Sequence, residues 1–356
     1  MKDKQLLTAV VILALAVLVS PSMAKEIYTF PDSQTVKVGD HPVLELTNPS
    51  GMVRVNSHSE NTIKIVSMKR VKARGKNDAE ELAGRIEIEI KSHPELVEVL
   101  TVHPKDKDRD FWEFLFGERG DSHIWVDYDL YVPKSCELRL ETTSGDVMVT
   151  KVDGNHKLNT ASGDITLKVV RGDLAIDATS GDILVSRTEG KVDIHVTSGD
   201  IRLDETKGDI TVDATSGDVQ GNDLTGNVSI SSTSGDVRLS GVRGDVKIDG
   251  LSSDIVVSQL EGGTTVNTTS GDISVSNETL SGTVYSFEST SGDVRFTLPG
   301  KKGGRVDLNT VSGSISAKMP VTLETFSNRK LLGYINPEGP EIRIQTTSGD
   351  VVISEE

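Results

Sequence analysis

The chain predicts an all-β fold: a parallel β-solenoid with two short strands in each 18-residue coil and a mixed insertion near its N-terminus. A Ser-Gly-Asp tripeptide recurs at a fixed spacing, and pairs of apolar residues spaced by two flank each copy. A second glycine-containing turn falls midway between successive copies. A short fixed period indicates one supersecondary unit stacked on copies of itself. We therefore expect a stack of two-stranded coils.

The serine of the tripeptide marks the period. It recurs every 18 residues at Ser144, Ser162, Ser180, Ser198, Ser216, Ser234, Ser252 and Ser270. The series continues at Ser291, Ser312 and Ser348, after two steps of 21 residues and one of 36. The steps of 21 indicate inserted loops, and the last step is twice the period. Ser50-Gly51 stands in the same register and predicts the first coil.

Each coil contains two predicted strands that bury one face. Apolar residues stand three and five positions after the serine, as in Ile165 and Leu167, and six and four positions before it, as in Leu174 and Ile176. A spacing of two is the strand period, and the Val and Ile that dominate these positions favour a half-buried pleated surface. Like strands of successive coils should therefore pair in parallel, about 4.8 Å apart.

A few positions depart from this pattern. Polar or empty slots occur at His156, Gly221 and Thr264, which we interpret as local irregularity. Aromatic residues that should enlarge the core near the C-terminal end are Tyr285, Phe287 and Phe296. The segment from Thr325 to Gly339 predicts a loop or cap there, because the open end of a solenoid exposes strand edges that are usually covered.

The aspartates of the tripeptides form a predicted ladder. Its members are Asp146, Asp164, Asp182, Asp200, Asp218, Asp236, Asp254 and Asp272. Carboxylates about 4.8 Å apart repel each other by roughly 1 kcal/mol in water, and calcium would relieve that repulsion. The turns lack the glycine-rich loops of calcium-binding β-rolls. We therefore interpret the aspartates as turn caps and expect neither a metal nor another cofactor.

The first 24 residues predict a secretory signal peptide. Lys2 and Lys4 form a basic start, Leu6 to Val19 is apolar, and Ser22-Met23-Ala24 is a small-x-small cleavage site. The apolar run is short for a membrane span of roughly 20 residues, so the mature chain should have no transmembrane helix. We expect a secreted, periplasmic or cell-surface protein, with residues 25–135 as the start of the solenoid and 136–356 as its repeat region.

The N-terminal third interrupts the repeat. A short helix is predicted over Asn77–Gly84, and strands over Arg85–Ile90, Leu96–Val102 and Ile124–Val132. Between the last two strands lies the loop Lys105–Ser122, which contains Phe111, Trp112, Phe114 and Phe116. The loop either plugs the first coils, or exposes aromatics rimmed by charge as a partner contact. On the second interpretation Phe111 and Trp112 are the candidate contact residues.

Composition excludes several classes of function. The net charge is −16, and removing Lys2, Asp3 and Lys4 (together +1) leaves −17, which disfavours nucleic acids and anionic membrane surfaces as partners. Cys136 is the only cysteine, so an intramolecular disulfide and a cysteine-based metal site are both excluded.

A polar row is predicted on the outer face, three residues before each serine. Its members are Glu141, Asn159, Asp177, His195, Asp213, Ser231, Asp249, Asn267 and Glu288. These side chains alternate with buried ones and should face solvent. Asp177, Asp213 and Asp249 are our candidates for contact with a repeating glycan or a cationic partner. The alternative is an ordinary solvated surface.

The repeated Thr-Ser-Gly-Asp-apolar-x-apolar pattern resembles the putative adhesin family of bacterial β-solenoid domains. The Tyr-x-Leu-x-Val-Pro segment (Tyr128–Pro133) and the ending Gly339–Ile353 carry the same resemblance, which covers roughly Val43–Ile353. It implies adhesion and a right-handed coil, and it transfers no catalytic residue.

The residues and this resemblance together favour a non-catalytic, adhesin-like binding or scaffold protein of the bacterial cell envelope. Its expected partner is an envelope or extracellular protein or a glycan. Two alternatives stay open. One is a polysaccharide-active β-helix enzyme, which would use clustered carboxylates in a groove. The other is a purely structural envelope rod.

Export is directly testable. We expect the exported protein to begin at Lys25, because the small-x-small motif places cleavage after Ala24. Mass spectrometry of the N-terminal peptide from the periplasmic or secreted fraction measures this. A cytoplasmic protein that retains Met1 would contradict it.

Overall fold

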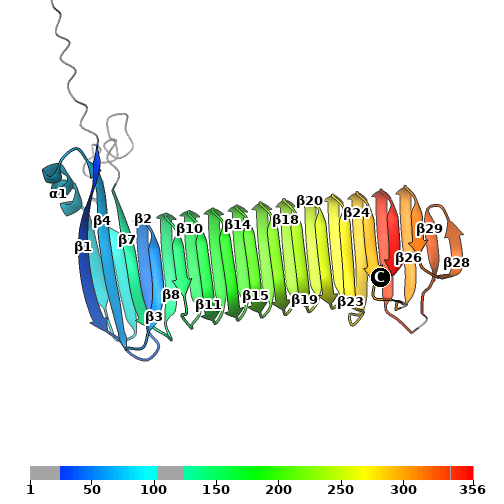
Figure 1. Cartoon of the computed structure of the whole chain (residues 1–356), viewed down its shortest axis with the longest axis horizontal. Helices are drawn as coiled ribbons and strands as arrows, with labels where there is room; N and C mark the ends of the chain where they lie inside the picture. Colours follow the sequence, from blue (N-terminus) through cyan, green and yellow to red (C-terminus); the bar gives the residue numbers. More distant parts are fainter. Residues whose placement is uncertain (1–24, 103–123, 301, 337, 356) are drawn as a thin grey trace, which may run out of the picture.

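The computed structural model describes residues 25–102, 124–300, 302–336 and 338–355. Within these residues nearly every element is a strand, and the strands stack into one long rod made of two facing sheets (Figure 1). The described part of sheet A has 15 strands and that of sheet B has 16. The predicted all-β parallel solenoid is confirmed. The predicted hand of the coil stays a prediction.

Each regular coil contributes one strand to sheet A and one strand to sheet B. Sheet A contains β9 (Val147–Thr150), β11 (Ile165–Arg171), β13 (Ile183–Glu189), β15 (Ile201–Lys207), β17 (Val219–Thr225), β19 (Val237–Arg243), β21 (Ile255–Glu261) and β23 (Ile273–Thr279). Sheet B contains β8 (Glu137–Ser144), β10 (His156–Ser162), β12 (Leu174–Ser180), β14 (Val192–Ser198), β16 (Ile210–Ser216), β18 (Val228–Ser234), β20 (Val246–Ser252) and β22 (Thr264–Ser270). Neighbours pair in parallel between residues 18 apart, for example Ile165 with Ile183.

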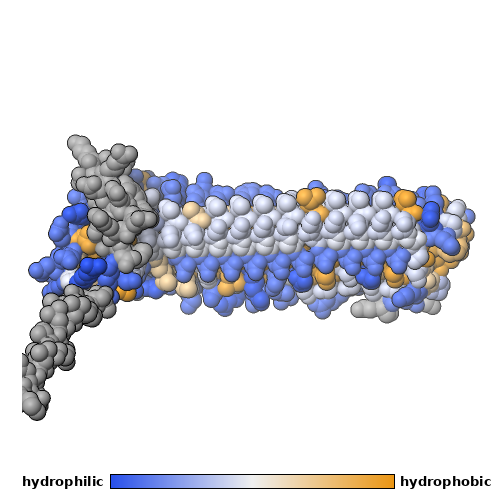
Figure 2. Space-filling model, turned by 90° about the horizontal axis from the view of Figure 1, so that it is seen from above, coloured by the Kyte–Doolittle hydropathy of each residue, from blue (hydrophilic) through white to orange (hydrophobic). Residues whose placement is uncertain are grey.

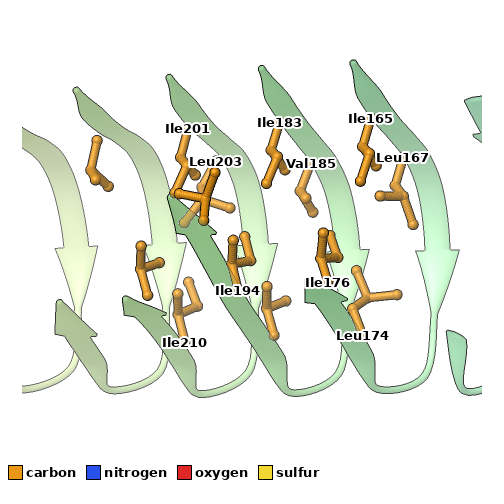
Figure 3. Close-up of a cluster of buried hydrophobic side chains, with 14 of the residues drawn as sticks. Ile165, Leu167, Leu174, Ile176, Ile183, Val185, Ile194, Ile201, Leu203 and Ile210 are labelled. Atoms are coloured by element: carbon orange, nitrogen blue, oxygen red, sulfur yellow. The ribbon is translucent and has the colours of Figure 1, made fainter. Parts of the chain in front are cut away.

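The core lies between the two sheets. The apolar positions predicted from the sequence face inward, as Figure 3 shows for Ile165 and Leu167 of β11 and for Leu174 and Ile176 of β12, and all four are buried. Stacked coils place identical positions on top of one another, so the core continues along the rod.

Each coil also has two inward positions that the sequence pattern did not predict. One lies two residues before the serine and holds small side chains such as Ala178 and Ala214. The other lies eight residues after it, as at Val170 and Leu224. The second arises because the residue just before it has a positive φ, 59° at Val169. This kink shifts the strand alternation by one residue, as a β-bulge does.

The irregular positions stay inside the core. Nδ1 of His156 accepts a hydrogen bond from the amide of Leu138 (3.3 Å), and burial lowers the pKa of this imidazole. The slot at Gly221 is filled by its neighbours, because a Cβ there would stand 2.7 Å from Leu239 and 2.8 Å from Leu224. Thr264 is 1% exposed.

The N-terminal end extends both sheets beyond the first coil. β2 (Val43–Ser50) and β3 (Val53–His58) form that coil, and Ser50 pairs with Ser144 as predicted. Sheet A continues with β7 (Ile124–Pro133), β4 (Thr62–Ala73) and β1 (Glu26–Lys37), and sheet B with β6 (Leu96–Val102) and β5 (Glu87–Ser92). The helix α1 (Lys76–Gly84) packs on β4 and β1. Among the described residues no helix is long and apolar enough to cross a membrane.

The coils at the C-terminal end do not follow chain order. Their strands are β24 (Val284–Ser291), β25 (Val294–Leu298), β26 (Arg305–Ser312), β27 (Ile315–Lys318), β30 (Glu341–Ser348) and β31 (Val351–Glu355). The last coil, β30 with β31, lies between the two coils that precede it in the chain (Figure 1). The predicted cap is the antiparallel hairpin of β28 (Thr322–Ser327) and β29 (Lys330–Tyr334), which pairs with β26.

We expect Gly181→Ala to destabilise the protein by at least about 2 kcal/mol. Gly181 has a φ of +121°, and a Cβ there would collide with the carbonyl group of Gly163 in the preceding coil. Chemical denaturation followed by circular dichroism measures the cost. Gly84→Ala is the control, since nothing lies within 4 Å of that Cβ and alanine favours a helix. Equal stabilities of the two variants would contradict the turn geometry.

Candidate functional site

A groove of about 840 Å³ runs along the outer face of sheet B, beside the Ser-Gly-Asp corner. It crosses seven coils, and each coil contributes the three residues that precede its serine. One wall, the outer row, is the predicted polar row over Glu141, Asn159, Asp177, His195, Asp213, Ser231 and Asp249. The other wall, the threonine row, is Thr143, Ala161, Thr179, Thr197, Thr215, Thr233 and Leu251.

The groove is concave because its floor lacks outward side chains. The floor residues stand between the two walls and point into the core, as Ala178, Val196 and Ala214 do. Side chains of a strand alternate between faces, so the walls rise on either side of bare backbone. The walls are two residues apart along the strand, or roughly 7 Å. The apolar spacing did not predict this groove. The small residues two positions before each serine, such as Ala178 and Ala214, are the sequence feature that could have indicated it.

The carboxylates of the outer row never occupy adjacent coils. Glu141, Asp177, Asp213 and Asp249 alternate with Asn159, His195 and Ser231 along the groove. The alternation continues past the groove through Asn267 and Glu288, which remain in register. It keeps like charges two coils apart, or about 10 Å, instead of about 4.8 Å.

The residues between the carboxylates hold them by hydrogen bonds. The Asn267 amide donates to Asp249 (2.7 Å), and His195 Nδ1 lies 3.0 Å from Asp213. With its amide oriented to donate, Asn159 lies 3.2 Å from Asp177. Burial raises the pKa of Asp249, but hydrogen bonds from Lys247 and Asn267 outweigh it, and the net effect is a lowered pKa. Asp249 is therefore held as a carboxylate, the form that only accepts hydrogen bonds.

Of the contact residues predicted from the sequence, the structure describes only the three aspartates. Asp177, Asp213 and Asp249 lie on the same wall of the groove, spaced by two coils each. Phe111 and Trp112, with the rest of the loop Lys105–Ser122, lie outside the described residues. The predicted signal peptide also lies outside them.

Seen from above, the edge of the rod beside the groove is a pale strip of near-neutral hydropathy between hydrophilic rows (Figure 2). The strip follows the corner where the strands of sheet B end, which is where their Thr-Ser-Gly residues turn into sheet A. The groove therefore borders a long, regular surface of small hydroxyl-bearing and glycine residues.

The aspartate ladder at this corner is made of backbone caps. Asp164 Oδ1 accepts a hydrogen bond from the amide of Asp182 (2.9 Å), and Asp182 Oδ1 accepts one from Asp200 (2.9 Å). The capped amide lies in the next coil and not in the aspartate's own turn. Among the described residues no group of three or more His, Cys, Asp or Glu side chains could hold a metal ion.

The buried thiol of Cys136 is not set up for nucleophilic chemistry. Burial raises its pKa to about 12, so the thiolate that would act as a nucleophile is not populated near neutral pH.

A parallel solenoid with a groove that repeats from coil to coil is a repeat protein, and this groove forms an extended surface along the rod. The chain belongs to the family described as Toastrack DUF4097, which matches residues 126–208 and 191–354. This confirms the resemblance drawn from the repeat. No curated protein matches the chain.

Several solved structures are similar over most of the chain. A putative adhesin from Bacteroides fragilis NCTC 9343 is 10% identical, with 92% of this chain and 97% of that one covered and a TM-score of 0.32. A putative lipid binding protein from Parabacteroides distasonis ATCC 8503 is 12% identical, with 90% and 96% covered and a TM-score of 0.31. A putative cell adhesion protein from Clostridium sporogenes ATCC 15579 is 8% identical, with 92% and 100% covered and a TM-score of 0.21.

We expect the protein to keep its fold without calcium. The ladder carboxylates are already bonded to backbone amides, so they need no cation to offset their repulsion. Circular dichroism in excess chelator should show the same strand signal and the same cooperative melt as in added calcium. A chain that unfolds in chelator, or a melting temperature that rises steeply with calcium, would contradict the capping role.

Proposed function

We propose that the protein is a non-catalytic, adhesin-like binding protein of the bacterial cell envelope, and that its groove holds an extended glycan. The observation that carries this proposal is the alternation of the outer row, which sets a carboxylate at every second coil across the groove. Carboxylates accept hydrogen bonds from sugar hydroxyl or amino groups. The threonine row on the other wall adds hydroxyl groups that both donate and accept.

The two-coil period favours a particular form of glycan. Carboxylates about 10 Å apart repeat over a distance longer than one sugar ring, which favours a polymer built of disaccharide units. Such a ligand would meet equivalent groups at Asp177, Asp213 and Asp249. The described residues that line the groove include no Phe, Tyr or Trp, so hydrogen bonds rather than stacking on such rings would carry the affinity.

The chemistry of the groove supports binding rather than cleavage. A glycosidase needs two carboxyl groups in different environments, one of them with a raised pKa that lets it donate a proton. The outer-row carboxylates are repeats of one position, and the pKa of Asp249 is lowered. A polysaccharide-active enzyme is therefore the weaker proposal.

The proposal includes location and organisation. Residues 1–24 would direct export, and residues 25–135 would form the base of the rod. The repeat region 136–356 would present the groove to the envelope or to the surroundings of the cell.

The test is binding of soluble glycans to the purified protein. We expect at least one disaccharide-repeat glycan to bind, and the triple variant Asp177→Ala, Asp213→Ala and Asp249→Ala to bind it about tenfold more weakly, roughly 1.4 kcal/mol. Its melting temperature should be unchanged, because the replaced side chains are on the surface.

The matched control is the triple variant Glu60→Ala, Glu278→Ala and Glu324→Ala. It removes the same charge from exposed positions outside the groove and should bind like the wild type. Equal affinity of the two triple variants would refute the groove as the site. Shortening of any glycan during the assay would refute the non-catalytic proposal.

A further inference from the structure

A second groove, of about 850 Å³, follows the opposite corner of the rod, where the strands of sheet A end. Its basic residues are Lys134, Lys151, Arg171, Arg187, Lys207 and Arg243, and its acidic residues are Asp153, Glu189, Glu205 and Asp223. The lining therefore carries six positive and four negative groups, a net +2, on a chain whose net charge is −16. The lining of this groove therefore has the opposite sign of charge to the chain as a whole.

Most charged side chains on the inner wall of this groove form ion pairs with oppositely charged neighbours. It is the position nine residues after each serine, where Asp153, Arg171, Glu189 and Lys207 alternate in sign before the neutral Thr225. Arg171 lies 3.2 Å from Glu189, and Lys207 lies 3.4 Å from the same carboxylate. Asp153 lies 3.6 Å from Lys134. These exposed pairs add little stability, and they leave this wall close to neutral.

The outer wall has no net charge, but its two cations and its two carboxylates lie in different halves of the groove, and the two cations have no acidic partner among the described residues. It is the position seven residues after each serine, occupied in order by Lys151, Val169, Arg187, Glu205 and Asp223. The side chains of Lys151 and Arg187 are exposed and make no ion pair or hydrogen bond with another described residue. They stand two coils apart, about 10 Å, and both belong to the N-terminal half of the groove.

The backbone of the outer wall is strained. Lys151, Val169 and Arg187 have φ values of 59°, 59° and 53°, a region that costs a non-glycine residue roughly 1–2 kcal/mol and that a β-branched residue such as valine rarely adopts. Gly241 occupies the same position three coils after Arg187 with a φ of 69°. Glycine therefore satisfies this kink. The same φ recurs at Glu205, Asp223 and Gln259 (50°, 54° and 53°), so the kink belongs to the coil, and the cations at Lys151 and Arg187 are what distinguish this half of the groove.

We propose that the N-terminal half of this groove, around Lys151 and Arg187, binds the phosphate or carboxylate groups of a linear anionic polymer. An arginine fork matches either group, and a lysine supplies a second point charge. Glu205 and Asp223 continue the same wall and confine the site to this half. At physiological salt the Debye length is about 8 Å, so repulsion from distant acidic residues is largely screened.

The positive φ at these positions allows a substitution that weakens binding without lowering stability. The double variant Lys151→Gly and Arg187→Gly removes both cations and also relieves the unfavourable φ. We expect its melting temperature to stay level or rise, while its affinity falls at least about tenfold. The control is Glu205→Gly with Gln259→Gly, which makes the same backbone change at φ values of 50° and 53° and removes no cation. The control should bind at least as tightly as the wild type.

The probes are linear polyphosphate and polygalacturonate, measured by titration calorimetry with the whole protein at about 50 mM and about 500 mM salt. Binding of one or both that weakens with salt is expected, and the tighter probe identifies phosphate or carboxylate as the preferred group. Binding of neither probe at low salt, or equal affinity of the double variant and the control, would overturn the proposal. The triple variant of the first groove should still bind, so the two proposals can fail separately.

Discussion

Every surface of this rod depends on the close contact between glycines of successive coils. At most Ser-Gly-Asp corners the carbonyl group of one glycine occupies the space where the next glycine would carry a Cβ, as Gly163 does beneath Gly181. The opposite corner repeats this with Gly172 and Gly190. Because both corners stack at the spacing of paired strands, neighbouring coils of the regular repeat stay in register, apart from a shift between β21 and β23. The side-chain rows along the two grooves repeat from coil to coil because this glycine contact repeats from coil to coil.

Stacking identical coils also stacks identical charges, and the chain solves that problem in three ways. The corner aspartates bond to backbone amides of the next coil, as Asp182 does with Asp200. The outer row separates its carboxylates with polar neutral groups, for example Asn267 beside Asp249. The inner wall of the second groove alternates sign, as Arg171 and Glu189 do. These three arrangements reduce the repulsion between like charges along the stack of a strongly acidic sequence.

The two grooves have different structural origins. The first exists because normal strand alternation turns a small residue such as Ala214 inward between two outward rows. The second exists because a positive φ at the seventh position, as at Arg187, turns the strand at the corner. One has carboxylates on its wall and the other has unpaired cations. The two proposed ligands would therefore be chemically different polymers, bound along opposite edges of the rod.

The sequence by itself determined what is local and periodic. The 18-residue step, the inward positions such as Ile165, the turns and the outer row all follow from spacing, because a repeated unit imposes the same environment on each copy. The tertiary structure decided whatever depends on which distant segment becomes a neighbour. It placed β30 between β24 and β26, gave the cap of Asp182 to the next coil, and made Val170 inward through the kink at Val169. The position of β30 is a contact between distant segments, which periodicity cannot encode. The cap and the kink do repeat with the coil, but they depend on an inter-coil hydrogen bond and on a backbone angle, and the spacing of apolar residues shows neither.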